Sequence, residues 1–574
     1  MPANVARLLP LPSRATRSTA LGLALLAACS TQLGSTLAAD PVAPVPPEAA
    51  QGQPAPENDL QHAKQLYADH CAGCHGENGG GLSVASKYLF PRPRDLRAGK
   101  FRLVSTQNNV PSRQDLHNIL LRGMPGSSMP PWGHLPLADR EALVDEVYRL
   151  RAEGARDEYV KMLREIEGIE DEELEDEDVQ QEIADFVKRS IVAGAGSEVP
   201  ELSAADPASI DRGREQYMTQ GCAQCHGNDG KGESKIAMFD AENMPSTARD
   251  FTLGIFKGGD DPASLYRRIV YGMPGSPMPS SNQLSPAQVN DLLNFIRSLS
   301  SEEQRKASVL NRETIVAKRI RGKVPELPDS NLWSTSAPAR PRLVPLWWRG
   351  GVTPELNIQA LHDGTTLAVR ITWRDSSDDR LALRSNEFED AVAMQLFDGS
   401  NEPFLGMGNH QTPVDIWYWD ANRQTLGKGY QEPYPNAVVD RYPLTEGLVT
   451  STDINRPGAQ LAHQAEVSLP AVASGNPIET KVGDSGASSL AAAGPGSSTF
   501  RFPQSRLVVA HGVWRKGEWS VVMTRPLATK SDAEGVSLKP GARVSAAFAL
   551  WDGAQQDRAS KKSITIWQDL KLEQ

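Results

Sequence analysis

Apolar side chains recur at helical spacing in four stretches of the first 300 residues. Leu60, Ala63 and Tyr67 lie three and four positions apart, so they would share one face of a helix. The same periodicity is found in three further stretches: 137–151, 210–217 and 285–299. The pattern therefore predicts two pairs of helices, which bracket two all-α units over residues 58–155 and 209–300.

From about Leu327 onward the pattern changes to alternation. Leu367, Val369, Ile371 and Trp373 alternate with other residues, which predicts a strand with one buried face. Six further segments have strand character: 392–397, 414–419, 507–513, 519–524, 544–550 and 563–570. Regular short strands without helices between them predict an all-β antiparallel sandwich over residues 326–574.

The remaining segments are interpreted as connections. We expect a signal peptide over 1–39, a Pro-rich linker over 40–57, an acidic helical or flexible linker over 156–208 and a partly helical connector over 301–325. The Gly-, Ser- and Ala-rich segment 473–498 is expected to form a loose loop inside the sandwich.

The N-terminal segment has the features of an export signal. The apolar run Ala20–Ala28 is too short to span a bilayer and follows a stretch with three Arg and no acidic residue. Residues 26–29, Leu-Ala-Ala-Cys, resemble the bacterial lipoprotein signal, in which Cys29 becomes the lipidated first residue. Cleavage after Ala39 is the alternative. We expect a periplasmic protein, anchored to the membrane by lipid if Cys29 is modified.

Acidic residues outnumber basic ones and give the chain a net charge of −11. Residues 165–182 hold eleven carboxylates and no Lys or Arg. Such a run is typical of a solvated helix or a flexible segment, and a landing site for a basic redox partner is the functional alternative. The overall charge argues against nucleic acid as a partner.

Two Cys-x-x-Cys-His motifs carry the candidate chemistry. They are Cys71–His75 and Cys222–His226, and a Gly-Met-Pro-Gly-Ser-x-Met-Pro phrase follows each of them, at 123–130 and 272–279. Two thiols to tether a porphyrin, a His to hold its iron and a remote Met to close the other face make a c-type haem site. The sequence therefore predicts two haem c groups, attached through four thiols and ligated by two histidines: Cys71, Cys74, Cys222 and Cys225 with His75 and His226.

Other readings of a Cys-x-x-Cys motif are a zinc half-site and a redox dithiol. Zinc would need a second pair of ligands near each motif, and a dithiol enzyme does not need the following His. The one further Cys in the chain is Cys29, in the signal segment. Haem attachment explains the motifs better than either alternative.

The order helix, Cys-x-x-Cys-His, loop, Met, helix resembles class I cytochromes c, whose first and last helices cross beside the haem. That family usually ligates iron from a Met-Pro-x-aromatic phrase, which favours Met129, before Pro130-Pro131-Trp132, and by correspondence Met278. The second copy lacks the aromatic residue. Met124 and Met273 therefore stay open as alternatives.

Cationic residues recur at corresponding places in the two copies. Arg94 corresponds to Arg249, and Arg102 corresponds to Lys257. Such groups could pair with haem propionates, which are carboxylates that need partners when buried, or lie solvated on the surface.

The strand-rich region resembles the haem-binding gamma subunit of ethylbenzene dehydrogenase and its relatives. The similarity rests on six segments: Ile371–Asp375, Phe388–Ala393, Gly406–Asn409, Val414–Trp417, Ala549–Gly553 and Lys561–Ile564. It implies one non-covalent haem b with Met and Lys as axial ligands, which are Met407 and a residue of the Lys561-Lys562 pair. Strand alternation places Lys562 on the face of Ile564 and Ile566, so Lys562 is preferred and Lys561 is the alternative.

The resemblance implies an electron-transfer subunit without catalytic residues of its own. Its partners would be iron–sulfur and molybdenum subunits of the dimethyl sulfoxide reductase family on one side, and soluble or membrane cytochromes on the other. A dihaem redox enzyme is one alternative, although such an enzyme needs an open iron face or a Cys ligand. A tethered binding or sensor module with a haem-free sandwich is the other.

Overall fold

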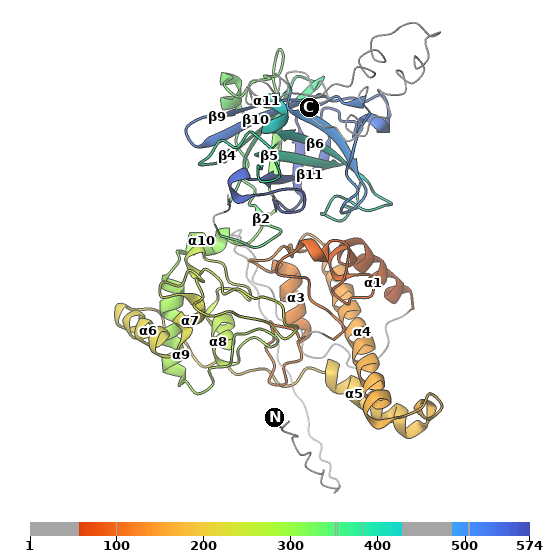
Figure 1. Ribbon diagram of the computed structural model, residues 1–574, viewed down its shortest axis with the longest axis vertical. Helices are drawn as coiled ribbons and strands as arrows, with labels where there is room; N and C mark the ends of the chain where they lie inside the picture. Colours follow the sequence, from red (N-terminus) through yellow and green to blue (C-terminus); the bar gives the residue numbers. More distant parts are fainter. Residues whose placement is uncertain are drawn as a thin grey trace, which may run out of the picture. The chain divides into compact units, whose positions relative to one another are not determined.

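The computed structural model describes residues 57–98, 100–350, 352, 354–382, 384–426, 485–502 and 505–574. The expected signal peptide, Cys29 and nearly all of the linker 40–57 lie outside these residues. Helices dominate the first half of the described chain and strands dominate the second (Figure 1). In this part of the chain, no helix combines the length and the apolar character needed to cross a bilayer.

The first repeat, expected over residues 58–155, contains the two helices expected from periodicity and two more. Its helices are α1 (Glu57–His70), α2 (Ala72–His75), α3 (Arg113–Arg122) and α4 (Leu137–Met162). Tyr67 on α1 packs with Leu143 and Val144 on α4 in one buried cluster. Ser112 and Asp115 cap α3 reciprocally, which fixes where that helix begins.

The second repeat, expected over residues 209–300, has the same order of elements. Its helices are α6 (Pro207–Thr219), α7 (Cys222–His226), α8 (Pro262–Val270) and α9 (Pro286–Ser298). The helices α6 and α9 cross at Gly213, where a Cβ would lie 2.0 Å from the carbonyl oxygen of Asp291. Only glycine permits this close approach of the two helices.

The acidic stretch between the repeats is helical and has a small core of its own. The helix α4 runs on to Met162, and α5 (Glu177–Ile191) folds back against it. Leu163, Leu174 and Ile183 are buried between them, and the rings of Tyr159 and Phe186 stack at 4.4 Å. The carboxylates therefore project from an ordered helical hairpin.

The β-sheet region, residues 314–572, follows the short helix α10 (Glu302–Ala307) and includes the helix α11 (Ala421–Leu426). Its strands are β1 (Thr314–Arg319), β2 (Val344–Pro345), β3 (Asn357–His362), β4 (Thr366–Arg374), β5 (Ala391–Phe397), β6 (Val414–Asp420), β7 (Ala487–Ala492), β8 (Thr499–Phe500), β9 (Val509–Trp514), β10 (Glu518–Pro526), β11 (Arg543–Trp551), β12 (Ser563–Ile564) and β13 (Gln568–Leu572). The main path of the sheet in the described residues runs β8-β7-β6-β5-β11-β13-β1-β3-β4-β10-β9.

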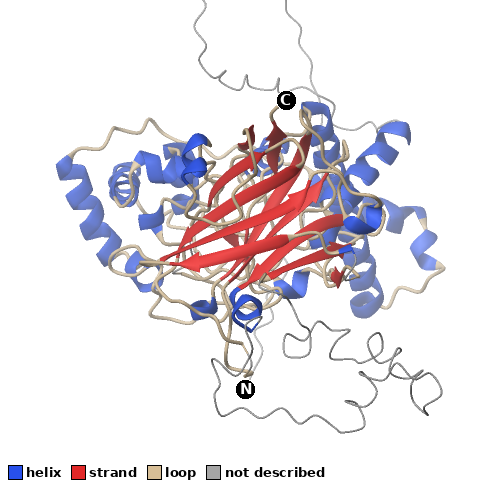
Figure 2. Cartoon of the chain, turned by 90° about the horizontal axis from the view of Figure 1, so that it is seen from above, coloured by secondary structure: helices blue, strands red, loops and turns tan. Residues whose placement is uncertain are grey.

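Strands that are far apart in that order are in contact through the rings of their tryptophans. Trp419 on β6 contacts Trp519 on β10 at 5.0 Å and Trp373 on β4 at 6.4 Å between ring centroids. The sheet therefore folds over on itself around a buried aromatic centre, and Figure 2 shows the strands in red. Burial of such large rings contributes strongly to the stability of this core.

Three sequence expectations need correction here. The sheet is not purely antiparallel, because β1 pairs in parallel with both β13 and β3. The segment 473–498 is not simply a loop, because β7 pairs antiparallel with β6, although 473–484 lie outside the described residues. The segment 563–570 is divided between β12 and β13, which pair with different neighbours.

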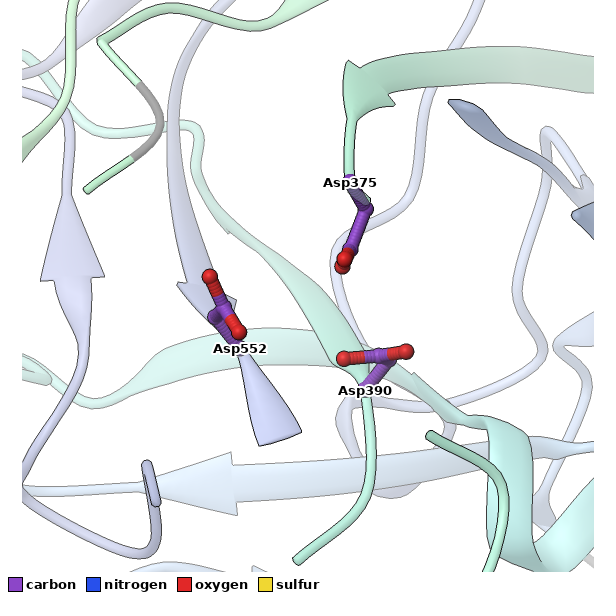
Figure 3. Close-up of side chains that lie close together, drawn as sticks. All are labelled: Asp375, Asp390 and Asp552. Atoms are coloured by element: carbon purple, nitrogen blue, oxygen red, sulfur yellow. The ribbon is translucent and has the colours of Figure 1, made fainter. Parts of the chain in front are cut away.

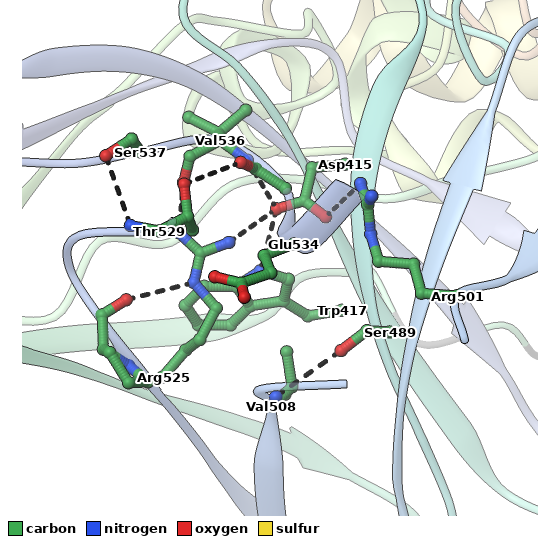
Figure 4. Close-up of polar contacts among 12 residues, drawn as sticks. Asp415, Trp417, Ser489, Arg501, Val508, Arg525, Thr529, Glu534, Val536 and Ser537 are labelled. Atoms are coloured by element: carbon green, nitrogen blue, oxygen red, sulfur yellow. Dashed lines mark hydrogen bonds and ion pairs between the residues drawn. The ribbon is translucent and has the colours of Figure 1, made fainter. Parts of the chain in front are cut away.

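A buried ion pair stabilises one end of the sheet. Arg525 on β10 donates to the carboxylate of Asp415 on β6 at 2.8 Å, and Arg501 donates to its other oxygen at 3.0 Å (Figure 4). The Arg525 guanidinium also lies over the ring of Trp417, 5.0 Å from its centroid. Because Arg525 and Asp415 are both buried, loss of Asp415 would leave the Arg525 guanidinium without its carboxylate partner.

Candidate haem sites

The first Cys-x-x-Cys-His motif forms a short helical turn after α1. The Nδ1 of His75 lies 2.8 Å from the carbonyl oxygen of Arg94, an acceptor, so Nδ1 carries the proton. The Nε2 is then unprotonated and available to a metal, which is how proteins orient a ligating His. Tyr67 donates to the carbonyl of Gly76 at 2.8 Å and fixes the end of the turn.

The two thiols of this motif are poorly suited to thiol redox chemistry. Burial raises the pKa of Cys71 to about 12 and that of Cys74 to about 12. A catalytic dithiol instead needs a lowered thiol pKa. Among the described residues, the one group of three or more potential ligands close enough to share a metal ion lies elsewhere, which gives a zinc site at these thiols no support. Both alternatives to haem attachment lose support.

The second motif repeats the tyrosine contact of the first but not its histidine hydrogen bond, because the Nδ1 of His226 has no hydrogen-bond partner among the described residues. Tyr217 donates to the carbonyl of Gly227 at 2.8 Å, as Tyr67 does in the first repeat. The ring of His226 stacks on Phe251 at 4.5 Å. Burial lowers the pKa of His226 to about 4, and the backbone of Arg249 opposes this shift. A neutral imidazole of this kind is the form that binds iron.

The two methionine loops have matching backbone hydrogen bonds. Met124 N–H donates to the carbonyl of Met129 at 3.1 Å, and Met273 N–H donates to that of Met278 at 3.2 Å. Both loops begin at a glycine with positive φ. Met124 and Met129 both line the cavity beside His75, so the choice of Met129, and with it Met278, stays a prediction.

Met407 adopts an unusual backbone conformation in the loop between β5 and β6. Its φ of +78° lies in the left-handed region, which non-glycine residues seldom occupy. Hydrogen bonds hold the loop on both sides, from Gly408 N–H to the Phe404 carbonyl and from Gly494 N–H to the Met407 carbonyl, each at 2.9 Å. Such strain costs roughly 1–3 kcal/mol and is typical of functional positions.

The two candidate lysines have different surroundings. Lys561 donates to the carbonyl of Gln555 at 2.6 Å, whereas the Nζ of Lys562 makes no hydrogen bond to any described residue and lies 4.8 Å from the centroid of the Trp551 ring. Burial lowers the pKa of Lys562 to about 8. Lys562 therefore has the free and readily deprotonated amine that a metal ligand needs.

One cavity of about 790 Å³ connects the first motif with the Met407 loop. It is lined by Cys71, Cys74, His75 and Met129 from the first repeat and by Met407 and Lys562 from the β-sheet region, but not by Lys561. Its size is in the range of cofactor sites, roughly 300–1,000 Å³. The thiols can tether a porphyrin, and imidazole, thioether and amine are donors that suit haem iron, so these residues fit the expected groups.

The sequence did not reveal a largely buried acidic cluster in the β-sheet region. Asp375, Asp390 and Asp552 offer carboxylate oxygens within 4.8 Å of one another (Figure 3). Burial and the Asp375 carboxylate raise the pKa of Asp390 to about 8. Asp390 accepts hydrogen bonds from Gly553 N–H and the Trp519 indole, each at 2.9 Å. All three aspartates lie in segments that carry the family resemblance, and this shared feature is the one sequence signal that could have pointed to the cluster.

Three family models match separate parts of the chain. Residues 333–563 match the family model described as ethylbenzene dehydrogenase. Residues 210–300 match cytochrome c, and residues 58–145 match subunit III of cbb3-type cytochrome c oxidase. The resemblance expected from the sequence motifs is therefore confirmed: the chain combines cytochrome c domains with a domain like the ethylbenzene dehydrogenase gamma subunit.

Three relatives are similar over part of their length. A protein of Haloferax mediterranei named as a respiratory nitrate reductase haem subunit is 26% identical over 37% of this chain and 54% of its own. The chlorate reductase gamma subunit of Ideonella dechloratans is 24% identical over 38% of this chain and 66% of its own. The dimethylsulfide dehydrogenase gamma subunit of Rhodovulum sulfidophilum is 25% identical over 37% and 58%. The matched part thus spans about half to two thirds of each relative, and each is named as one subunit of a reductase or dehydrogenase.

Proposed function

We propose that this chain relays electrons between a molybdenum oxidoreductase of the dimethyl sulfoxide reductase family and respiratory cytochromes, through one haem b and two haem c groups. In this proposal Cys71, Cys74 and His75 hold the first haem c, and Cys222, Cys225 and His226 hold the second. Met129 and Met278 close their distal faces, and Met407 and Lys562 hold the haem b. When bound, these groups supply one-electron redox centres.

The observation that carries the proposal is the cavity shared by the first Cys-x-x-Cys-His motif and the Met407–Lys562 pair. Phe404, three residues before Met407, lies directly against Gly73 between the two cysteines. Residues that would hold two redox centres thus line one apolar space. Covalent fusion keeps the two sites at high effective concentration without a separate docking step.

Backbone hydrogen bonds also link the two sites. Phe90 N–H of the first repeat donates to the Leu346 carbonyl at 3.0 Å, and Leu346 N–H donates to the Lys562 carbonyl at 2.9 Å. This short ladder ties the loop that follows the first motif to the residue proposed as a haem b ligand. These bonds would hold the two proposed haems at a fixed distance, and a fixed distance between electron donor and electron acceptor favours reproducible electron transfer.

The proposed partners follow from the relatives. Relatives named as gamma or haem subunits of nitrate reductase, chlorate reductase and dimethylsulfide dehydrogenase support an oxidoreductase complex as the electron source or sink. The cytochrome c domains support onward exchange with soluble or membrane cytochromes. We place the protein in the periplasm because haem c attachment of this kind occurs outside the cytoplasm, with a lipid anchor at Cys29 as part of the proposal.

Carbon monoxide binding distinguishes electron relay from redox catalysis. If all three irons have two protein ligands, carbon monoxide added to the dithionite-reduced protein leaves the Soret bands nearly unchanged. Strong binding at a c haem would contradict the relay and favour a dihaem enzyme, because catalysis needs an open iron face.

A further inference from the structure

Four cationic side chains from corresponding positions of the two repeats meet at the boundary between the repeats. Arg94 and Arg102 come from the first repeat, and Arg249 and Lys257 come from the second. The electrostatic neighbours of Lys257 include all three arginines. Residues that are equivalent by sequence are therefore gathered in one place rather than distributed over two separate sites.

Two carboxylates compensate part of this charge. Arg94 pairs with Glu242 at 2.6 Å, and Arg102 pairs with Asp240 at 2.7 Å. Both pairs cross from one repeat to the other. With four cations and two anions, the cluster retains an excess of positive charge.

Arg249 is buried without a partner. It is 7% exposed, and none of its three guanidinium nitrogens has a hydrogen-bond partner among the described residues. It lies over the Trp348 ring at 4.8 Å and against Gly126, where a Cβ would come within 2.6 Å of its Nε. An unpaired buried guanidinium is costly, so this site is built for an anion.

Lys257 reaches into the haem cavity of the other repeat. Its side chain lines the same cavity as Cys71, Cys74 and His75, although it belongs to the second repeat. Its Nζ makes no hydrogen bond to a described residue, and burial together with the nearby arginines lowers its pKa well below the usual value for lysine. An anion bound inside that cavity would give the Nζ of Lys257 a partner.

We propose that Arg94, Arg102, Arg249 and Lys257 form one shared site for the propionate carboxylates of both c haems, in which Lys257 of the second repeat pairs with a propionate of the haem on Cys71 and Cys74. The inference rests on the proposed function, because it requires both c haems. Guanidinium and ammonium groups bind carboxylates through short, charge-assisted hydrogen bonds. The site would fix the two c haems relative to each other and give the second repeat control over the potential of the first.

The test compares Lys257→Gln with Lys257→Arg and with Lys306→Gln in the full-length holoprotein. Lys306 is an exposed lysine on α10, paired with Glu302, and serves as the matched charge control. Spectroelectrochemical titration gives the midpoint potential of each c haem. The wave of the first haem is identified by the fall that Met129→Ala causes in it.

Removal of a nearby cation favours the more positive ferric state, so Lys257→Gln is expected to lower the potential of the first haem. Lys257→Arg should restore it, and Lys306→Gln should leave both potentials unchanged. An unchanged first-haem potential in Lys257→Gln, or a shift confined to the second haem, would overturn the inference. If the same samples contained fewer than two c haems per chain, the proposed function would be overturned instead.

Discussion

The ring of Phe404 lies so close to Gly73 that a Cβ at position 73 would come within 2.9 Å of three of its carbons. Gly73 is part of the first Cys-x-x-Cys-His motif, and Phe404 lies three residues before Met407 in the loop between β5 and β6. Real Cβ atoms almost never approach other heavy atoms this closely. The two proposed haem sites are therefore in direct contact through this pair of residues.

Gly73→Ala should disturb the haem b site while both c haems stay attached. The added methyl group would displace Phe404 and with it the strained Met407 loop, because the contact includes the Cγ of the ring and not only its edge. We expect a weakened or shifted b-type absorption band. Phe404→Ala in the same chain should relieve the clash and restore much of the band. A normal b-type spectrum in Gly73→Ala alone would contradict this account.

Lys562→Ala should remove or alter the b-type spectrum, and Lys561→Ala should not. The two lysines are neighbours in sequence, but only Lys562 lines the cavity, whereas Lys561 donates to the Gln555 carbonyl. Reduced-minus-oxidised spectra of the two variants provide the measurement, and both should keep a full complement of haem c. If Lys562→Ala and Lys561→Ala gave the same b-type spectrum, Lys562 would not be a ligand.

Met129→Ala should open the first c haem to carbon monoxide, while Met124→Ala should leave it closed. Both side chains line the cavity, and Met129 also packs with Trp132 against the core of the first repeat. Loss of the distal thioether leaves one iron face free and lowers the potential. Reversal of the two results would assign Met124 as the ligand, and by correspondence Met273 in the second repeat.

The helices and the haem-attachment motifs could be predicted because their signals are local. The apolar stripe of α1 and the Cys-x-x-Cys-His turn each lie within a few residues, and nothing distant is needed to form them. Alternation likewise predicted β4, in which Leu367, Val369 and Ile371 are all fully buried, but the expectation of a single buried face was wrong, because Ala368 on the other face is buried as well.

The elements that were missed depend on distant partners. Only Ile315 and Ala317 are buried in β1, too few for a strand signal, and its pairing with β13 and β3 comes from the fold. The strand β7 consists of Ala, Ser and Leu, a composition typical of loops, yet pairing with β6 makes it a strand. The meeting of Arg94 with Lys257 depends on how the repeats pack, which no local pattern encodes.

The acidic cluster should make the β-sheet region less stable as the pH rises. The pKa of Asp390 is about 8 in the folded chain, against about 3.9 for an exposed aspartate. Between about pH 4 and pH 8 the unfolded chain releases this proton while the folded chain keeps it, so the free energy of unfolding falls through that window and levels off above it. At about 1.4 kcal/mol per pKa unit, the loss should be a few kcal/mol.

Asp390→Asn remains neutral at every pH and should flatten this dependence. Urea unfolding followed by circular dichroism at pH 5 and pH 8 gives the measurement, with the exposed Asp532→Asn as the control. The variant should also lose stability at pH 5, because an amide cannot accept all the hydrogen bonds that the Asp390 carboxylate accepts. If the free energy of unfolding of Asp390→Asn changed between pH 5 and pH 8 as much as that of the unaltered protein, the raised pKa of Asp390 would be contradicted.

The central claim is that one chain holds a non-covalent haem beside two covalent ones. A pyridine haemochrome spectrum of the purified full-length protein, with acid–acetone extraction to separate free from attached haem, tests it most directly. The account predicts two haem c and one extractable haem b per chain. A ratio of two to zero would contradict the haem b site formed by Met407 and Lys562 and favour a β-sheet region that binds no haem.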